Sequence, residues 1–320
     1  MDIEDDTSAG PTQRIGDSRE HGQEWLVRDI VYVNGRYLPR DEALISVEDR
    51  GYQFGDGVYE VVRFQGRRGL RLRAHLERLE RSSDELRIVG GPSAEEWTTI
   101  LERLMDECEL ADDTRVWSLY QQVSRGVCAR NHIFPKTPFE PSSVAYFRPA
   151  PQYSAAQREE GIALSTQQDE RWERCHIKTV CLLPVVLAKQ AAAEAGAFEA
   201  LLVRDGKVTE GGATNAYSVR DGVVWTHPEG KHILSGVTRC MVMEAAERSG
   251  VEVREESVSI EEFRSAEEAF LSSTTMDIMP ATQLDGKPIG TGKVGEVTRK
   301  LVAAINDIVA REFSPVAEVR

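Results

Sequence analysis

Two side chains have the types and settings that carbonyl chemistry requires. Lys178 lies in residues 174–179, directly before an apolar segment, where loss of water would lower the pKa of its amine and make it a nucleophile for an aldehyde. Glu210 ends a predicted hairpin strand before two glycines, where its carboxylate could keep a pyridine nitrogen protonated. A solvated lysine and an exposed strand-end glutamate are commoner in proteins, so neither residue identifies a site by itself.

Three further segments carry groups that bind small anions. Residues 235–239, Ser-Gly-Val-Thr-Arg, open a predicted helix whose free N–H groups and dipole favour a phosphate, and Thr238 adds a hydroxyl. Residues 272–275, Ser-Ser-Thr-Thr, follow a short apolar strand, and Arg78 offers a planar guanidinium. A helix cap, a turn and an arginine that reaches water are the ordinary explanations, and spacing alone does not make the three segments converge.

Arg130 and His132 place two cationic side chains two residues apart, as a clamp for a carboxylate requires. The alternative is a surface loop after Gly126. The sequence leaves both interpretations open.

The elements that must position these residues follow from hydrophobic periodicity. Residues 58–64 alternate as a strand, with Val58 and Glu60 on one face and Tyr59 and Arg63 on the other. A Ser-x-x-Glu capping box at Ser93 predicts the start of a helix. Further helices are predicted over residues 74–86, 184–195, 237–249 and 294–311, the third with a C-terminal glycine at 250.

Turn residues predict the domain organisation. Asn34-Gly35, Asp205-Gly206 and Asp221-Gly222 are hairpin turns, and the last two indicate a largely antiparallel second half. The prolines at 149 and 151 favour a linker. We therefore expect a mixed α+β protein with an acidic, disordered tail at 1–24, a small N-terminal domain at 25–148, a linker at 149–154 and a larger domain at 155–320.

Composition excludes several classes of function. The 320 residues include 53 acidic and 39 basic side chains, a net charge of −14, which argues against binding nucleic acid or an anionic membrane. Five cysteines without a C-x-x-C pair support neither a disulfide framework nor a zinc site, and no metal ligand set is predicted. With no signal peptide and no apolar run of spanning length, we expect a reduced, cytoplasmic protein.

Taken together and in order, six segments resemble the fold-type IV pyridoxal-phosphate enzymes, and within them the D-amino-acid aminotransferases. They are residues 49–60 (DRGYQFGDGVYE), 75–79 (HLERL), 177–179 (IKT), 208–211 (VTEG), 233–239 (ILSGVTR) and 272–275 (SSTT). The resemblance covers about residues 30–299, and six ordered segments are far more specific than any one. It implies the two-domain fold of that family, with a small N-terminal α/β domain, and pyridoxal 5′-phosphate as the cofactor.

The resemblance also implies a role for each matching residue. Lys178 matches the lysine that binds the cofactor covalently and moves the substrate proton, and Glu210 matches the partner of the pyridine nitrogen. Arg78, Val237, Thr238, Ser273 and Thr274 match the phosphate site, and Leu234 matches the apolar residue on the ring. Tyr59, Arg130 and His132 match the substrate-carboxylate site, the last two supplied by the partner subunit of a homodimer.

The Arg-x-His pair resembles that of the D-amino-acid enzymes, and the resemblance implies transfer from a D-amino acid to a 2-oxo acid such as 2-oxoglutarate or pyruvate, by a ping-pong mechanism. A branched-chain or R-amine transaminase is the first alternative. A lyase of the same fold, of the aminodeoxychorismate lyase type, is the second. A non-catalytic binding protein is the third, which intact Lys178 and Glu210 disfavour. Gly212-Ala213-Thr214 stands where D-amino-acid enzymes often carry a serine-rich loop, so the sequence leaves side-chain selectivity open.

Overall fold

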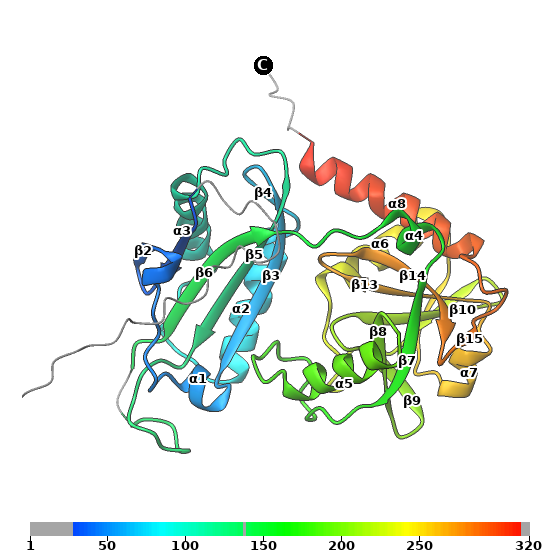
Figure 1. Ribbon diagram of the computed structural model, residues 1–320, viewed down its shortest axis with the longest axis horizontal. Helices are drawn as coiled ribbons and strands as arrows, with labels where there is room; N and C mark the ends of the chain where they lie inside the picture. The colour runs from blue at the N-terminus through cyan, green and yellow to red at the C-terminus, as the bar shows by residue number, and fades with distance from the viewer. Residues whose placement is uncertain (1–27, 137–138, 315–320) are drawn as a thin grey trace, which may run out of the picture.

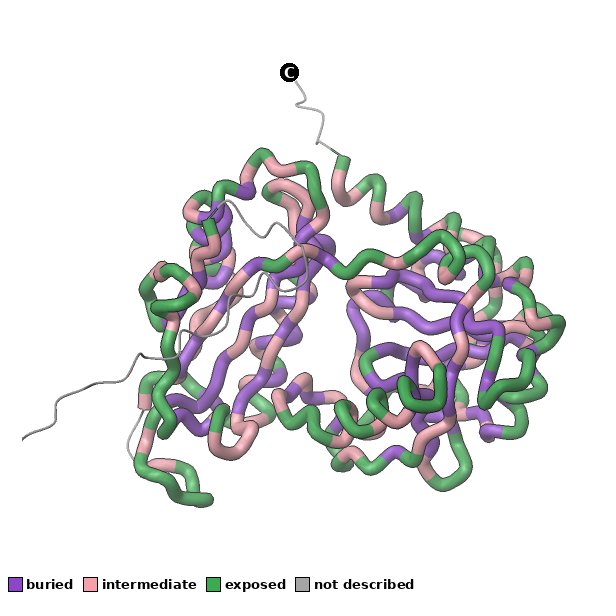
Figure 2. The backbone as a smooth tube through the Cα atoms, viewed as in Figure 1, coloured by how far each residue is buried: buried purple, intermediate pink, exposed green. Residues whose placement is uncertain are grey.

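The computed structural model describes residues 28–136 and 139–314 and contains two β-sheets, each with its own helices (Figure 1). The predicted tail at 1–24 falls outside the described residues. Figure 2 shows that buried residues follow the strands of both sheets, whereas the connecting segments are largely exposed. No helix in the described ranges is long and apolar enough to cross a bilayer.

The first sheet is antiparallel and has the strand order β2-β1-β6-β5-β3-β4. Its strands are β1 (Ile30–Val33), β2 (Arg36–Pro39), β3 (Gly57–Gln65), β4 (Arg68–Gly69), β5 (Val116–Ser124) and β6 (Ser142–Pro149). The helical segments are a 3₁₀ turn (Arg40–Glu42), α1 (Arg50–Phe54), α2 (Leu72–Glu85) and α3 (Ala94–Glu107). One core joins this sheet to α2 and α3, with Leu76 and Trp97 packed near Phe64 and almost fully buried.

Strand β3 has the predicted alternation. Val58, Glu60 and Val62 are each 0% exposed, on the face that α2 covers. Arg63 is on the opposite face yet is also buried, because it faces the second sheet and forms an ion pair with Asp277 of β14. On this second face Arg63 is buried, whereas Tyr59 and Val61 are partly exposed.

The second sheet has the order β12-β11-β10-β13-β14-β7-β8-β9, with β15 paired to β14. Its strands are β7 (Ile162–Gln168), β8 (Glu199–Arg204), β9 (Lys207–Gly211), β10 (Asn215–Arg220), β11 (Val223–Thr226), β12 (Val253–Glu255), β13 (Glu268–Ser273), β14 (Asp277–Leu284) and β15 (Lys287–Pro288). Its helices are α4 (Ala155–Glu159), α5 (Leu183–Glu194), α6 (Val237–Ser249), α7 (Ile260–Arg264) and α8 (Glu296–Phe313). Most described pairings are antiparallel, as expected, but β7 runs parallel to β8 and β14, and β12 runs parallel to β11.

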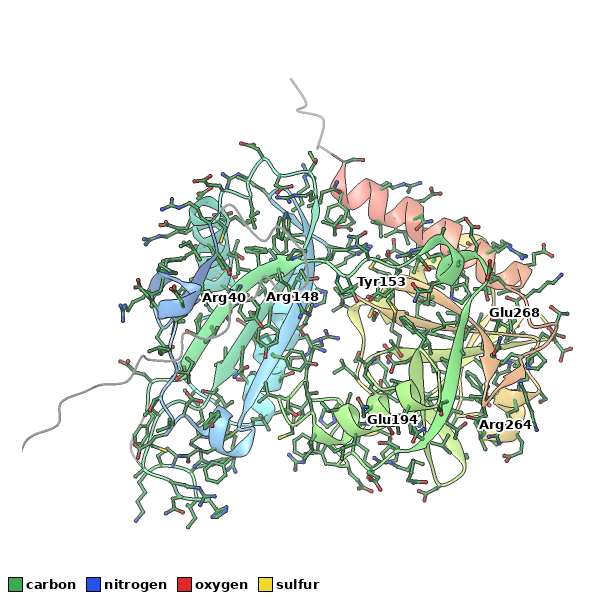
Figure 3. The ribbon with its side chains drawn as sticks, in the orientation of Figure 1. Arg40, Arg148, Tyr153, Glu194, Arg264 and Glu268 are labelled. Atoms are coloured by element: carbon green, nitrogen blue, oxygen red, sulfur yellow. The ribbon has the colours of Figure 1, made fainter. Side chains whose placement is uncertain are left out.

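Local sequence rules account for the element boundaries. The three predicted hairpin turns join β1 to β2, β8 to β9 and β10 to β11, each with two successive positive φ angles. The capping box of Ser93 and Glu96 begins α3, and Gly250 ends α6 in the left-handed conformation. The carboxylate of Glu268, labelled at the right of Figure 3, accepts hydrogen bonds from the backbone N–H groups of Val297 and Thr298 in the first turn of α8.

Residues 150–154 connect the sheets, between the end of β6 at Pro149 and the start of α4. Tyr153 in this connection lies beside the second sheet and its helices (Figure 3), and its hydroxyl shares a 3.2 Å hydrogen bond with the hydroxyl of Thr275. The connection is therefore fixed to the turn between β13 and β14, which carries part of the predicted anion site.

Candidate active site

A cavity of about 540 Å³ has walls from both sheets and brings together four of the predicted site residues. Tyr59 of β3 lines it from the first sheet, and Glu210 of β9 from the second. Lys178 and Leu234 come from the loops that precede α5 and α6. Residues from four separate segments of the chain therefore face the same space, which sequence spacing could not establish.

Backbone pairing with β3 fixes the position of Lys178. Its carbonyl accepts from Tyr59 N at 3.0 Å, and Val180 N donates to the carbonyl of Gly57 at 3.1 Å. The side-chain Nζ lies 4.4 Å from the centroid of the Tyr59 ring. Residues 178–180 thus run along β3 like a short additional strand, and the Lys178 amine lies beside the Tyr59 ring of that strand.

The Glu210 carboxylate is buried and surrounded by donors. Arg171 contacts Oε1, Asn215 Nδ2 donates to Oε2 at 3.0 Å, and Leu234 N donates to Oε2 at 3.1 Å. Burial raises the pKa of Glu210, although the charge of Arg171 opposes that rise. A carboxylate held in this way can accept a hydrogen bond from a protonated ring nitrogen.

Arg171 and Asp169 are parts of this site that the sequence did not reveal. Burial would raise the pKa of Asp169, but its hydrogen bonds and ion pair with Arg171 lower it to about 2. Burial would lower the pKa of Arg171, but Asp169 and Glu210 raise it. The two residues are close in sequence, but no motif marks them, because their other partners Glu210 and Thr209 lie about 40 positions away and only folding brings them close.

A second buried network surrounds Arg78. Its Nε and Nη2 donate to the two oxygens of Glu60 at 2.6 and 2.9 Å, and His75 Nδ1 lies 2.7 Å from the same carboxylate. Burial would raise the pKa of Glu60, but Arg78 and His75 lower it. Burial lowers the pKa of His75. Its spacing placed Glu60 on the same strand face as Val58, the structure shows that this face is buried, and a buried carboxylate requires such partners.

This network predicts a large stability effect at Glu60. The Glu60→Gln variant leaves the Arg78 charge unpaired in the interior, so we expect a loss of about 3–5 kcal/mol in the free energy of unfolding at pH 7. Because the folded-state pKa of Glu60 is depressed, its stabilisation is complete above its ordinary value of 4.5 and is lost as the pH falls below it. Urea titrations should therefore show a difference between variant and wild type that shrinks below about pH 4.5. A difference that stays constant down to about pH 3 would contradict this account.

Three of the five predicted anion-binding residues, Arg78, Val237 and Thr238, lie at the N-terminus of α6. Arg78 Nη1 donates to the Ser235 carbonyl at 2.8 Å, and Val237 and Thr238 are buried in the first turn of the helix. At Gly236 a Cβ would lie 2.2 Å from Asn215 Oδ1, so glycine is required for the helix to approach β10. Ser273 and Thr274 are half-buried at the end of β13, where Ser272 pairs with Asn215.

Arg130 and His132 do not join this chain's own cavity. They lie in the exposed loop between β5 and β6, at the lower left of Figure 1, and their side chains flank Phe54 at 5.0 and 5.3 Å from its ring centroid. Arg50 Nη1 donates to the Asn131 carbonyl at 2.5 Å, which ties the loop to α1. The loop is anchored, but neither Arg130 nor His132 lines the cavity of Lys178.

Comparisons with known proteins agree with the resemblance seen in the sequence. A sequence model described as "Amino-transferase class IV" matches residues 57–284. A D-alanine aminotransferase of Bacillus licheniformis is 39% identical over 282 residues, covering 88% of this chain and 98% of that protein. One from Staphylococcus aureus strain MW2 is 38% identical over 273 residues, covering 85% and 94%.

Solved structures share the fold. A branched-chain aminotransferase of Escherichia coli superposes with a TM-score of 0.81 at 24% identity, covering 91% of this chain and 98% of that one. One from the archaeon Thermoproteus uzoniensis, solved with norvaline, superposes with a TM-score of 0.77 at 24% identity, covering 89% and 96%. A further branched-chain aminotransferase, solved with pyridoxamine 5′-phosphate, has a TM-score of 0.80 at 25% identity, covering 90% and 96%. The predicted mixed α/β, fold-type IV architecture is confirmed. The chain belongs to the class IV aminotransferase family.

Proposed function

We propose that the protein is a D-amino-acid aminotransferase that uses pyridoxal 5′-phosphate and passes the amino group to a 2-oxo acid such as 2-oxoglutarate or pyruvate. The observation that carries the proposal is that Lys178 and Glu210 face one cavity in a chain 39% identical to a D-alanine aminotransferase. The two sheets are the proposed domains, and residues 149–154 are the proposed boundary between them.

The residues present fit this cofactor. Glu210 is a buried carboxylate at the cavity wall, suited to a protonated ring nitrogen, and Leu234 supplies an apolar surface for the ring. The Thr214 hydroxyl lines the same cavity, is buried, and has no hydrogen-bond partner among the described residues. Such an orphan group indicates a polar ligand that the chain itself does not supply. Arg78, Val237, Thr238, Ser273 and Thr274 would hold the phosphate.

The cofactor, when bound, supplies an electron sink for a carbanion at the substrate Cα. Lys178 is held by β3 so that its amine would bind the cofactor aldehyde, and would then carry the proton of the substrate Cα to the former aldehyde carbon, C4′. Glu210 keeps the ring nitrogen protonated, which maintains the sink. Tyr59, with an arginine and a histidine, would bind the substrate carboxylate and so decide which enantiomer presents its Cα hydrogen to Lys178.

A half-reaction panel tests the proposal directly. Holoenzyme is mixed with D- and L-alanine, D- and L-glutamate and L-leucine, and the loss of the visible absorbance of the lysine-bound cofactor is followed. We expect D-alanine and D-glutamate to react and their L-enantiomers not to. Reaction with L-leucine and none with D-alanine would overturn the proposal and favour a branched-chain aminotransferase, the alternative that the structural similarity supports.

We further propose a homodimer in which Arg130 and His132 complete the partner's site. Both side chains lie outside their own cavity, and large apolar side chains are exposed in α1, in the segment before it and on α5. Leu44, Val47 and Tyr52 are each more than 70% exposed, and Leu183, Val186 and Leu187 of α5 are each more than half exposed. Apolar surface of this extent favours burial against a second copy of the chain.

Complementation of two inactive variants tests this arrangement. A mixture of Lys178→Ala and Arg130→Ala chains should recover about a quarter of the wild-type activity, because half of randomly paired dimers contain one intact site. The two variants alone, and the Lys178→Ala/Arg130→Ala double variant, serve as inactive controls. If Arg130 acted within its own chain, the mixture would stay inactive after unfolding and joint refolding.

A further inference from the structure

Arg50 is a buried arginine that joins the loop of Arg130 and His132 to the first sheet. It is 3% exposed and is the first residue of α1. Its Nη1 donates to the carbonyl of Asn131 at 2.5 Å, and its backbone N donates to the carbonyl of Gly126 at 3.0 Å. Asn131 lies between the two cationic residues, so Arg50 holds the backbone from which both of their side chains project.

Asp56 fixes the direction of the Arg50 guanidinium. Its Oδ2 accepts from Arg50 Nε at 2.7 Å, and its two oxygens also accept from Arg125 Nε and Nη2 at 2.8 and 2.9 Å. All three side chains are nearly buried. Burial would raise the pKa of Asp56, but the two arginines lower it. The carboxylate therefore stays charged at neutral pH and is held from two sides by the stronger, charge-assisted kind of hydrogen bond.

The ring of Phe54 in α1 gives the loop a second contact. Its centroid lies 4.8 Å from Arg50 Cζ, 5.0 Å from Arg130 Cζ and 5.3 Å from the centroid of the His132 ring. Residues 130–136 belong to no helix or strand and are mostly exposed, so such contacts, rather than a hydrogen-bonded ladder, must order them. One backbone hydrogen bond and one shared ring together orient both cationic side chains.

A preformed clamp binds a carboxylate more tightly than one that must first be ordered. Fixing a loop and its long side chains costs conformational entropy. That cost weakens binding of the anion unless the folded protein has already met it. Arg50 orders the loop before any substrate arrives, so its contribution belongs to substrate affinity rather than to the chemical steps at Lys178.

We propose that Arg50 is a positioning residue for the substrate carboxylate and that it acts on the site of the partner subunit. Oriented by Asp56, it holds the loop so that Arg130 and His132 receive the carboxylate of a D-amino acid or a 2-oxo acid in the partner's cavity. This inference rests on the proposed function, since it takes the dimer and the role of the two cationic side chains as given.

The test compares Arg50→Met and Arg50→Lys with Arg40→Met. Arg40, labelled beside the first sheet in Figure 3, is a matched control away from the loop. It also pairs with a carboxylate through Nε, donates to a backbone carbonyl through Nη2 and lies over an aromatic ring. For each holoenzyme, rapid-mixing half-reactions with D-alanine give the Kd and the limiting rate. Calorimetry gives the affinity for propanoate, an unreactive carboxylate.

We expect Arg50→Met to raise the Kd of D-alanine and of propanoate by about 10-fold and to change the limiting rate less than about threefold. Arg50→Lys keeps the charge but lacks the planar fork that reaches both Asp56 and the Asn131 carbonyl, so it should also weaken binding. Arg40→Met should match wild type. Should Arg50→Met fold poorly, Arg50→Lys decides by the same criteria. Wild-type affinity in Arg50→Lys, or a limiting rate that falls as much as the affinity, would overturn the inference.

Mixed dimers separate this role from a structural one. The Arg50→Met chain is unfolded and refolded with about a tenfold excess of the Lys178→Ala chain, whose own site is inactive but whose loop is intact. The active site of each mixed dimer then receives its loop from the Lys178→Ala chain, so we expect a wild-type Kd for D-alanine. A Kd that stays raised would place the effect within the Arg50→Met chain itself and contradict the proposal. Failure of the proposed function is recognised separately, by wild-type protein that does not react with D-alanine.

Discussion

Replacing Lys178 with alanine should abolish transamination, with a loss of about 10⁴-fold in kcat, the upper range for a positioned acid–base group. Its amine lies 4.4 Å from the Tyr59 ring centroid, and its backbone is paired with β3. A water molecule taking its place would lack this fixed position. The visible absorbance of covalently bound cofactor should vanish with the activity, and both are measured on the same samples.

Two other lysines make this experiment specific. Lys189 lines the same cavity, but its Nζ forms a 2.7 Å ion pair with buried Glu199, so it cannot replace Lys178. Lys189→Met should therefore retain covalent cofactor. Lys231→Ala, which removes an exposed lysine paired with Glu173, should match wild type. Covalent attachment that persists in Lys178→Ala and disappears in Lys189→Met would show that Lys189 is the reactive lysine and contradict the prediction.

Glu210→Gln has the second largest expected effect. The substitution keeps the size of the side chain and an acceptor for Asn215 and Leu234, but removes the charge that we propose keeps the ring nitrogen protonated. We expect kcat to fall by about 10²–10³-fold, the cost of removing one preorganised electrostatic group. Cofactor binding should persist, as measured by absorbance. The exposed Glu173→Gln variant is the control.

The pH dependence gives an independent measure of the same carboxylate. Burial raises the pKa of Glu210 and Arg171 opposes that rise, so activity should fall on the acidic side as Glu210 takes up a proton. Arg171→Met removes the opposing charge, and the acidic limb should move to higher pH. An acidic limb that stays in place, or a Glu210→Gln enzyme with kcat within about threefold of wild type, would remove Glu210 from the mechanism.

Much of the fold could be predicted because it depends on neighbours in sequence. The hairpin turns at Asn34, Asp205 and Asp221 need two residues that tolerate positive φ, and all three formed as expected. Helix α6 runs over the predicted residues 237–249, because its glycines at 236 and 250 mark both ends. The period of two in β3 likewise placed Glu60 on the buried face.

The residues of the candidate site also divide into those that sequence motifs identified and those that only the tertiary structure revealed. Lys178, Glu210, Leu234 and Tyr59 were identified by segments similar to a known family, and tertiary structure then showed that they share a cavity. The Arg171–Asp169 pair and the Arg63–Asp277 pair carry no such pattern.

The sequence by itself therefore determined the elements and the turns and provided the proposed reactive side chains, since each depends on backbone preferences or on local residue order. Tertiary structure alone decided which charges meet. Arg63 and Asp277 lie 214 positions apart, and His75, Arg78 and Glu60 meet across two different elements. Burial makes such pairs obligatory, because an unpaired charge in the interior is costly, but which residues pair depends on how the two sheets pack.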